Sequence, residues 1–523
     1  MASLRSERRL FLAAVAGAVL VRLAFILTSN LPFESDEAIV GLMARHILYA
    51  GDRPIFYYGQ QYMGPLEAVT AAISFALLGP SLVALRVAPM LWSVVLVGFS
   101  AAYARRAFGP AAFWFTLAYL AVPPLFLVTW SVKARGGYPE LLAFGAILLY
   151  QTLGLVETPD GKPWRWLVFG ALAGLGLWTN PLIVVFLAPV TGYLILHLRG
   201  RMARWTSPAA VGAAIVASAP MVIANARQPG VTLRQLAGPA VNQPITAHQL
   251  ISNTGEAIKQ SLPVVLGFFQ GCSYRPMFFA TRAASGIPFT PVAAGCFLVA
   301  LIGGGLLAVS LVRAIVDRPT PLDLLLWVGA LTMLPFILTQ QQPDYVTEPR
   351  YLLPLYALVP VAAVYWAKLW RYRATVAAAV LGMILLFNVT GYLRFIPDLA
   401  GPFIDGQPVH TGDAALAQLL ESQGVHTLYA DYWLSYPIAF HSQEGVKTAV
   451  IDDHLGVGFN RYIPYAIAAV ADPQPAILVI TGSPTDTYLQ AWLDEHRATY
   501  QVHHWENLTL YDHVTPRFAP VNG

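Results

Sequence analysis

Charged side chains are scarce in this sequence: 11% of its 523 residues are Asp, Glu, Lys or Arg, and 56% are hydrophobic. Globular domains in water carry roughly 25% charged residues. A chain this apolar cannot cover its own surface with polar groups, so we expect lipid to surround much of it. The formal net charge is only +4, and the basic residues stand in short clusters between apolar runs. That pattern indicates orientation in a membrane and argues against nucleic acid as a partner.

Cysteine is nearly absent, and so are the signatures of several kinds of site. Two cysteines, Cys272 and Cys296, are too few for a disulfide scaffold or a cysteine-rich metal site. The histidines are scattered without ligand spacing, and the C-terminal part has neither a Gly-x-Gly-x-x-Gly fingerprint nor a phosphate loop. No small-residue cleavage site follows the apolar run from Leu10 to Thr28, so we interpret this run as a retained first helix.

Long apolar runs are abundant. An α-helix needs about 20 apolar residues to cross the hydrocarbon of a bilayer. Eleven runs of this kind begin near Leu10, Leu82, Pro110, Tyr138, Trp166, Pro181, Pro208, Pro288, Leu322, Tyr351 and Ala374. A further run, Met63 to Leu78, is ambiguous because it is short, opens with Gly64-Pro65 and carries Glu67 in its first turn.

The basic residues decide whether Met63 to Leu78 spans, because cytoplasmic loops carry an excess of Lys and Arg. If this run does not span, nearly all the dense basic clusters fall on the cytoplasmic side: Arg5/Arg8/Arg9, Arg105/Arg106, Lys162/Arg165, Arg199/Arg201/Arg204, Arg313/Arg318 and Lys368/Arg371/Arg373. We therefore predict about eleven transmembrane helices, with Met63 to Leu78 as a half-buried juxtamembrane helix. The N-terminus is expected in the cytoplasm and the C-terminus outside it, in an integral membrane protein of a prokaryotic plasma membrane.

This topology predicts a transmembrane domain over residues 1–396 and a soluble extracytoplasmic domain over residues 397–523. The first external loop covers 29–80 with its juxtamembrane helices, and a second long external loop covers 227–287. In the C-terminal domain, helices are predicted at 414–423, 462–470 and 485–497, and strands at 427–433, 447–451, 476–481 and, as one or two strands, 500–511. Strands that alternate with helices are typical of a small layered α/β domain.

An acidic motif, Glu34-Ser35-Asp36-Glu37, follows directly after the first span. Acidic clusters in external loops are most often solvated, but this one stands close to the helix end, which fixes its depth near the membrane surface. An amphipathic segment follows, so we expect the carboxylates to cap a helix that lies on the bilayer. Aromatic, amide and carboxylate groups that suit a sugar come next: Tyr57, Tyr58, Gln60, Gln61, Tyr62 and Glu67. Aromatic belts at membrane surfaces also arise for purely structural reasons.

Four of the basic residues at the predicted external face lie in a short loop or at the ends of spans. Lys133 and Arg135 form the only basic pair in a short external loop, and Arg86 and Arg350 lie at the outer ends of their spans. Each of them is also compatible with an ordinary residue of the membrane interface, whose long side chain carries its charge into the water.

The order of these features resembles the GT-C superfamily of membrane glycosyltransferases. A basic N-terminus, a first span, an Asp-Glu pair and a Gly-Pro-Leu juxtamembrane helix ending in Leu78-Gly79-Pro80 are followed by Ala84-Leu85-Arg86. The sequence is most similar to the branch of protein O-mannosyltransferases and lipid A aminoarabinose transferases, over roughly the first 200 residues. The similarity returns at Glu348 to Pro354, which resembles the Arg-Tyr-x-x-Pro motif of a late span in that family.

The resemblance implies a GT-C fold and a sugar donor linked to a polyprenyl or dolichyl phosphate, used on the extracytoplasmic face. It implies that Asp36 is the catalytic base, with Glu37 beside it, and that Glu140 is an accessory acidic residue. A base at this place fits inverting transfer, since it takes the proton of the attacking acceptor hydroxyl while lipid phosphate leaves. Lys133, Arg135, Arg350 and Arg86 would bind the donor phosphate. No cofactor is required, although a divalent metal held by Asp36 and Glu140 stays open.

Some positions depart from the family pattern. Many relatives have Pro-Pro-Leu where this chain has Gly64-Pro65-Leu66, and relatives often have Thr-Lys where this chain has Thr179-Asn180. The C-terminal α/β domain also argues against the protein O-mannosyltransferases themselves, which carry a different domain in an internal loop.

Two other functions compete with glycosyl transfer. A transporter or flippase of a lipid-linked or polar solute would need ionisable residues deep in its spans, whereas these spans carry almost none except Arg22. An inactive scaffold or polysaccharide-assembly partner also fits the C-terminal domain. The acceptor, whether glycan, lipid or protein, is not specified by the sequence.

Overall fold

The computed structural model describes residues 2–198, 206–237, 245–268, 291–338, 349–395, 403–404, 407–408 and 414–521. Within these ranges, eight helices are long and apolar enough to cross a membrane, and a pair bent by 68° gives a ninth candidate. The eight are α1 (Ala2–Thr28), α4 (Leu82–Phe108), α7 (Tyr138–Glu157), α9 (Val184–Leu198, preceded by η2, Pro181–Ile183), α16 (Pro291–Val316), α17 (Pro321–Leu338), α18 (Val359–Tyr372, preceded by η8, Pro349–Leu358) and α19 (Ala374–Leu393). The bent pair is α10 (Thr206–Ala217) with α11 (Ala219–Arg227). The chain is thus a polytopic integral membrane protein, as predicted.

The number of candidate spans is smaller than the predicted eleven because two of the apolar runs form shorter helices. The run near Pro110 forms α5 (Pro110–Ala121) and, after a break, α6 (Leu125–Trp130), while the run near Trp166 forms α8 (Trp164–Thr179). With 12 and 16 residues, α5 and α8 fall below the usual length of a span. Hydropathy counts apolar residues but does not register a break, such as the one that Pro123-Pro124 forces on α5.

The predicted juxtamembrane helix is α3 (Leu66–Leu78), which has 13 residues and is too short to span. Its N-terminal neighbour Gly64 donates a hydrogen bond to the Trp178 carbonyl (2.6 Å). The side of the membrane on which α3 lies stays a prediction.

The break between α5 and α6 has its carbonyls satisfied by side chains of other helices. Arg22 of α1 donates to the carbonyls of residues 120 and 121 (3.1 and 3.2 Å). Asn388 and Tyr392 of α19 donate to those of residues 122 and 123. Non-helical backbone is tolerated at membrane depth only when its polar groups find partners within the protein. This requirement explains why a span carries a fully buried arginine.

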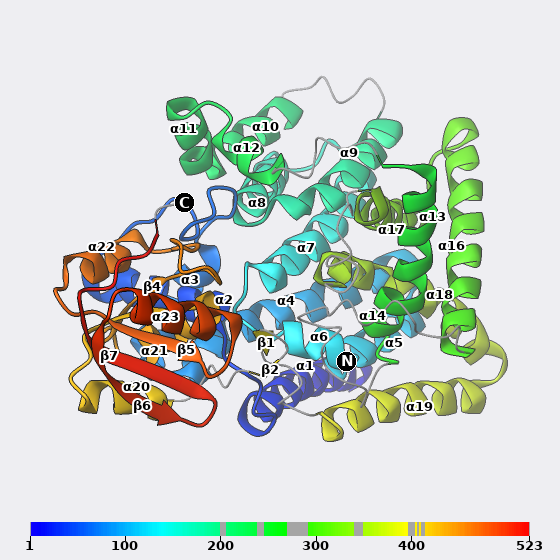
Figure 1. Ribbon diagram of the computed structural model, residues 1–523. Coiled ribbons are helices and arrows are strands. Elements are labelled where there is room, and N and C mark those ends of the chain that lie inside the picture. Colours follow the sequence, from blue (N-terminus) through cyan, green and yellow to red (C-terminus); the bar gives the residue numbers. More distant parts are fainter. Residues whose placement is uncertain are drawn as a thin grey trace.

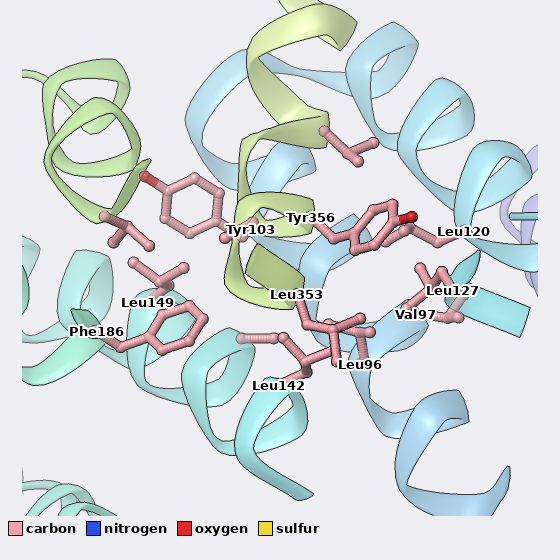
Figure 2. Packing of buried hydrophobic residues seen from close by; sticks show 14 of the residues in the cluster. Leu96, Val97, Tyr103, Leu120, Leu127, Leu142, Leu149, Phe186, Leu353 and Tyr356 are labelled. Atoms are coloured by element: carbon pink, nitrogen blue, oxygen red, sulfur yellow. The ribbon is translucent and has the colours of Figure 1, made fainter. Parts of the chain in front are cut away.

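The helical core lies between α4, α5, α7, α9, η8 and α18. Figure 2 shows its packing, with labelled side chains from α4 (Leu96, Val97, Tyr103), α7 (Leu142, Leu149), α9 (Phe186) and η8 (Leu353, Tyr356) interlocking around one centre. These side chains are buried, and the Tyr103 hydroxyl donates to the Pro321 carbonyl (2.6 Å). The core holds α4 and α7 together, and these two helices carry Arg86 and Glu140 at their N-terminal ends.

The second predicted loop is partly described. It contains α12 (Val231–Ala237), α13 (Ala247–Glu256), the π-helical turn η5 (Ala257–Ser261) and α14 (Leu262–Val265). Residues 269–287 of this loop, which include Cys272, lie outside the described residues, whereas Cys296 is buried in α16.

The C-terminal domain is a layered α/β unit, as predicted. Its five-stranded sheet has the order β4-β3-β5-β7-β6, with β3 parallel to β4 and β5 and with β7 antiparallel to β5 and β6. The elements are α20 (Ala414–Ser422), β3 (Thr427–Ala430), α21 (Tyr432–His441), β4 (Lys447–Val450), α22 (Ile463–Ala471), β5 (Ala476–Ile480), α23 (Pro484–Glu495), β6 (Thr499–Trp505) and β7 (Leu508–Thr515). A small antiparallel pair, β1 (Phe403–Ile404) and β2 (Gln407–Pro408), precedes it.

One prediction in this domain was wrong. The strand predicted over 427–433 ends at Ala430, and α21 begins at Tyr432. The cause is Asp431, whose side chain accepts a hydrogen bond from the Trp433 amide (2.7 Å) and so caps a helix that the β-rich local composition did not indicate.

This unpredicted helix is also where the C-terminal domain meets the transmembrane domain. Figure 1 shows the orange and red domain at one side of the helical body, beside α2 (Ser35–Arg45) and α3. Gly41 of α2 lies so close to α21 that a Cβ atom there would be 2.5 Å from Phe440 Cε2. The close approach brings side chains of the C-terminal domain to the acidic motif.

Candidate active site

The acidic motif forms the first turn of α2. Glu34 is the N-cap residue, in extended conformation, and its Oε2 accepts a hydrogen bond from the Asp36 amide (3.0 Å). Carboxylates at a helix N-terminus are stabilised by the free amides and the helix dipole. The prediction that the carboxylates cap a helix is confirmed.

The predicted surroundings of that helix were wrong. Nine of the eleven residues of α2 are buried within the protein, where we expected a helix lying on the bilayer. The reason is that α3, α4 and α21 all pack against α2, so helices of the protein cover it where we expected lipid. A helix that lies on the bilayer and a helix that packs against α21 have the same amphipathic pattern. The sequence alone therefore did not reveal that α21 covers α2.

Asp36 lies between two arginines from distant parts of the chain. Its Oδ2 pairs with Arg135 Nε (2.9 Å) and its Oδ1 with Arg461 Nη2 (3.0 Å). The Tyr432 hydroxyl also donates to Oδ1. The Asp36 side chain keeps 16% of its surface exposed, whereas those of Glu34 and Glu37 keep 1% and 0%. Asp36 is therefore the accessible carboxylate of the motif.

Arg135 is held in place by a shaped turn between α6 and α7. Gly136 and Gly137 both adopt positive φ (80° and 70°), which glycine reaches without strain. The Asn180 amide donates to the Gly136 carbonyl (3.0 Å), so this position, where relatives often have a lysine, fixes the turn here.

Glu37 and Arg86 form a buried ion pair behind Asp36. Arg86 Nε and Nη2 donate to the two carboxylate oxygens of Glu37 at 2.9 and 3.0 Å. Lys133, fully buried, donates to the Pro32 carbonyl (3.0 Å) and lies 3.6 Å from Glu34 and 3.9 Å from Glu37. These contacts favour positioning roles for Glu37, Arg86 and Lys133, while their predicted roles in catalysis and phosphate binding stay predictions.

Among the residues that the structure describes, the ion pairs join into one network of four cations and three carboxylates. It runs from Arg86 through Glu37, Lys133, Glu34, Arg135 and Asp36 to Arg461. Positive charge therefore exceeds negative charge by one when every group is ionised. Burial raises the pKa of Glu34, although Arg135 and Lys133 oppose the shift, so the protonated form of Glu34 would increase the excess.

The pKa of Asp36 moves the other way. Burial on its own would raise it, but the Arg135 and Arg461 guanidiniums and the Tyr432 hydrogen bond together hold the pKa of Asp36 well below its usual range. Asp36 is thus ionised, as a base must be. At the same time, both of its carboxylate oxygens are bound by Arg135, Arg461 and Tyr432.

The predicted sugar-binding residues divide into three groups. Tyr57 and Gln60 belong to the Asp36 site: the Tyr57 hydroxyl donates to the Asp36 carbonyl (2.5 Å), and the Gln60 amide oxygen, in the orientation that satisfies both partners, accepts from Arg461 (2.8 and 3.1 Å). Tyr62 is half-buried, and burial, with Tyr351 nearby, raises its pKa to about 12. The Tyr58 hydroxyl points elsewhere, since it donates to Asp52 and bonds to His46, and the backbone amide of Gln61 donates to the Gln235 side chain.

Glu67 and Glu140 form a second buried acidic pair. Glu67 Oε2 accepts from the Gly137 amide (3.0 Å), and neither oxygen of Glu140 has a hydrogen-bond partner among the described residues. Burial and the charge of Glu140 raise the pKa of Glu67 well above its usual range. The described part of the chain contains no group of three or more His, Cys, Asp or Glu side chains suited to a metal ion. The metal site through Asp36 and Glu140 stays a prediction.

Arg350 lies in the first turn of η8. Its guanidinium carbon lies 5.1 Å from the centre of the Tyr351 ring, and its charge helps to lower the pKa of Asp36. Glu348, which precedes it in the family-like motif, lies outside the described residues.

Sequence reasoning missed Arg461 and Tyr432. Both come from the C-terminal domain, about 400 positions after Asp36 in the chain. The signal available was composition: residues 397–523 contain only four basic residues, and Arg461 stands among Phe459, Tyr462 and Tyr465. A lone arginine in an aromatic stretch of an acidic domain is a candidate for a buried ionic contact.

The comparisons with known proteins support the predicted resemblance. Residues 63–224 match the family described as dolichyl-phosphate-mannose-protein mannosyltransferase. No curated protein sequence matches this chain. The fold is similar to two crystal structures of ArnT from Cupriavidus metallidurans, each 16% identical. The form bound to undecaprenyl phosphate has a TM-score of 0.58 with 99% of both chains covered, and the apo form has 0.61 with 98% of both. An apo oligosaccharyltransferase of Archaeoglobus fulgidus is 14% identical, with a TM-score of 0.47 over 98% of this chain and 75% of that one.

Proposed function

We propose that the chain is a GT-C membrane glycosyltransferase that depends on a polyprenyl- or dolichyl-phosphate sugar, and that Asp36 is the general base of an inverting sugar transfer. The observation that carries the proposal is that Asp36 is the one carboxylate of the acidic motif with an exposed face. A base must come within hydrogen-bond distance of the acceptor hydroxyl. Glu34 and Glu37 are closed off from any acceptor by burial.

The reaction transfers one proton and exchanges one bond. The acceptor oxygen attacks the anomeric carbon, the bond from that carbon to the phosphate oxygen breaks, and the Asp36 carboxylate takes the acceptor proton. Lipid phosphate leaves with its bonding electrons and needs no proton, because it is already a good leaving group. One carboxylate is therefore sufficient, in contrast to glycoside hydrolysis, where a second carboxyl group acts as the acid.

The cations around Asp36 support an anionic donor. Arg135 pairs with Asp36, and the charge of Arg350 is near enough to help lower the pKa of Asp36, while Arg86 and Lys133 are engaged with Glu37, Glu34 and backbone carbonyls. We assign Arg135 and Arg350 to the donor phosphate and give Arg86 and Lys133 the role of holding the acidic motif. The charge on the phosphate grows as the bond breaks, and fixed cations in a water-poor site stabilise this growth without reorganising.

The comparisons point to a donor chemistry. The matched family is named for dolichyl-phosphate mannose, and the ArnT crystal form contains undecaprenyl phosphate. We propose a polyprenyl-phosphate-linked hexose as donor, used on the extracytoplasmic face. Tyr57 and Gln60, which border Asp36, are the candidates for contact with the sugar.

The test is transfer by the purified full-length chain in liposomes, with a panel of polyprenyl-phosphate sugars that begins with mannose. The expected result is release of polyprenyl phosphate, with a product whose anomeric configuration is opposite to that of the donor. Retention of configuration would exclude a direct attack assisted by Asp36. Transfer from a nucleotide sugar, with no use of any lipid-linked donor, would exclude the donor class.

A further inference from the structure

We propose that Arg461, which the C-terminal domain inserts into the site, binds the phosphate of the lipid-linked donor and thereby exchanges its contact with Asp36 for one with the substrate. The inference rests on the proposed function and adds to it a specific residue in a domain that sequence reasoning left without a role. It makes the C-terminal domain a part of the active site.

The Arg461 side chain is held in an aromatic cage. Its guanidinium carbon lies 4.8 Å from the centre of the Phe459 ring, 5.6 Å from that of Tyr57 and 5.7 Å from that of Tyr432. Its Nε donates to the Tyr432 hydroxyl (3.1 Å), and its backbone amide donates to the Tyr436 hydroxyl (2.5 Å). Cation–π contacts of this kind hold an arginine plane in place while its edge stays available for hydrogen bonds.

The first loop of the transmembrane domain is shaped around the same arginine. Gly59 has φ of +70°, and a Cβ atom there would lie 2.7 Å from Arg461 Cδ. The Gln60 amide oxygen accepts from both terminal nitrogens of Arg461. Residues of both domains therefore contact Arg461. Its side chain keeps 6% of its surface exposed.

Among the described residues, the ion-pair network around Asp36 has one more cation than carboxylate. Four cations face three carboxylates in it. A buried cation without a matching anion costs several kcal/mol in the low dielectric of a protein. The phosphodiester of a lipid-linked sugar has one negative charge, and the departing phosphate monoester has about −1.5 to −2 at neutral pH. The donor supplies the missing charge, and the product supplies more.

Arg461 fits the exchange better than the other cations. Arg86 has a bidentate contact with Glu37, and Lys133 is fully buried, so neither can turn outward without leaving a buried charge unpaired. Arg461 makes a single contact with Asp36, which retains Arg135 and Tyr432 if Arg461 turns to phosphate. Arginine also suits phosphate, because its planar fork can donate two parallel hydrogen bonds.

The exchange has a consequence for the base. While Arg461 pairs with Asp36, the carboxylate has both oxygens engaged by cations and the Tyr432 hydroxyl. When phosphate draws Arg461 away, Asp36 loses one positive neighbour and holds a proton more readily. Donor binding would therefore activate the base, and an empty site would keep it inactive.

The experiment measures the affinity of the full-length, detergent-solubilised chain for undecaprenyl phosphate and for the neutral alcohol undecaprenol. We expect Arg461→Gln to weaken undecaprenyl phosphate binding about 10- to 100-fold, the usual cost of losing hydrogen bonds between charged groups. Affinity for undecaprenol should not change. Arg461→Lys, which keeps the charge and loses the fork, should give an intermediate affinity, and Asp36→Asn should bind the phosphate more tightly than the wild type.

Arg45→Gln is the matched control. Arg45 also bridges the two domains, 3.6 Å from Glu444, but does not reach Asp36. It should leave the phosphate affinity unchanged, so a general loosening of the domain interface would be recognised by its effect here. Thermal unfolding of each variant in detergent tests folding, and Arg461→Lys carries the test if Arg461→Gln fails to fold.

The outcomes separate the two proposals. Equal affinity of the wild type for undecaprenyl phosphate and undecaprenol would exclude the proposed donor class and this inference with it. Preference for phosphate that persists unchanged in Arg461→Gln, with a lower kcat and an unchanged donor KM, would overturn the inference alone: Arg461 would then only orient Asp36. A raised donor KM with weaker phosphate binding supports the phosphate contact.

Discussion

Glu37 of α2 and Arg86 of α4 form a two-pronged ion pair, with N–O distances of 2.9 and 3.0 Å and both side chains almost fully buried. Arg86 also donates to the Leu31 and Pro32 carbonyls at 2.8 and 3.2 Å. The pair therefore fixes the segment that leads from the first span into the acidic motif. Because both side chains are buried, an acceptor cannot reach this ion pair. Its role is therefore to hold Asp36 in place.

Removal of one partner of this pair should destabilise the protein strongly. Glu37→Gln leaves the Arg86 charge buried without a counter-charge, and the loss expected from such a change is about 3–5 kcal/mol. The measurement is thermal or denaturant unfolding in detergent, with Glu157→Gln as the control. Glu157 also pairs with an arginine, Arg106, but its side chain is 54% exposed, and exposed pairs contribute about 0–1 kcal/mol. Equal effects of the two substitutions would contradict the structural role of Glu37.

The break between α5 and α6 should depend on Arg22. Arg22→Met leaves the carbonyls of residues 120 and 121 without their side-chain donor, and an unpaired buried polar group costs about 1–3 kcal/mol. We expect a lower unfolding temperature. Arg9→Met, an exposed position on the same helix, is the control. If Arg22→Met were as stable as wild type, the carbonyls would have to find other partners, and our account of the buried arginine would fail.

The contact between α2 and α21 should be sensitive to one methyl group. Gly41→Ala places a Cβ atom 2.5 Å from Phe440 Cε2, so either the ring or the C-terminal domain must shift. We expect faster proteolysis of the C-terminal domain and slower sugar transfer, because Arg461 and Tyr432 reach Asp36 across this contact. Gly98→Ala in α4 has open space around the new Cβ, and a helical glycine replaced by alanine is stabilising by roughly 0.5–1 kcal/mol. Identical behaviour of the two variants would show that the interface is loose.

The buried Glu67 should make stability fall as the pH rises. Burial and the neighbouring Glu140 raise the folded-state pKa of Glu67 above its unfolded value. The folded protein then binds more protons than the unfolded chain. The stability that the protonated Glu67 contributes is fully present below the unfolded pKa of about 4.3 and is lost as the pH rises through the folded pKa. Glu67→Gln removes this dependence. The measurement is the unfolding temperature of wild type and variant from pH 5 to pH 9, in steps of about one pH unit. Parallel curves would mean that Glu67 is not protonated in the folded state.

Local patterns predicted the components of the site but not how they assemble. The carboxylates at the start of α2, the arginine and lysine before α7 and the length of α3 were readable, because each depends on neighbours in the chain or on hydropathy. The roles of Arg461 and Tyr432 were not readable, since they depend on a contact about 400 positions away. The same limit applies to α2: its apolar face predicts burial but does not say whether lipid or α21 covers it. The break after α5 was hidden for a related reason, because hydropathy does not record where Arg22, Asn388 and Tyr392 supply hydrogen bonds.

The central claim is that Asp36 is the base, and single-turnover sugar transfer by Asp36→Asn tests it most directly. The asparagine keeps the size of the side chain and cannot accept the acceptor proton, so the transfer rate should fall by at least about 100-fold, the lower range for loss of general base catalysis. The variant should remain folded and should bind undecaprenyl phosphate more tightly than the wild type, because Arg461 is released from Asp36, and Glu157→Gln should transfer at the wild-type rate. A transfer rate for Asp36→Asn within about twofold of wild type, far short of the loss that removal of a general base causes, would contradict the account.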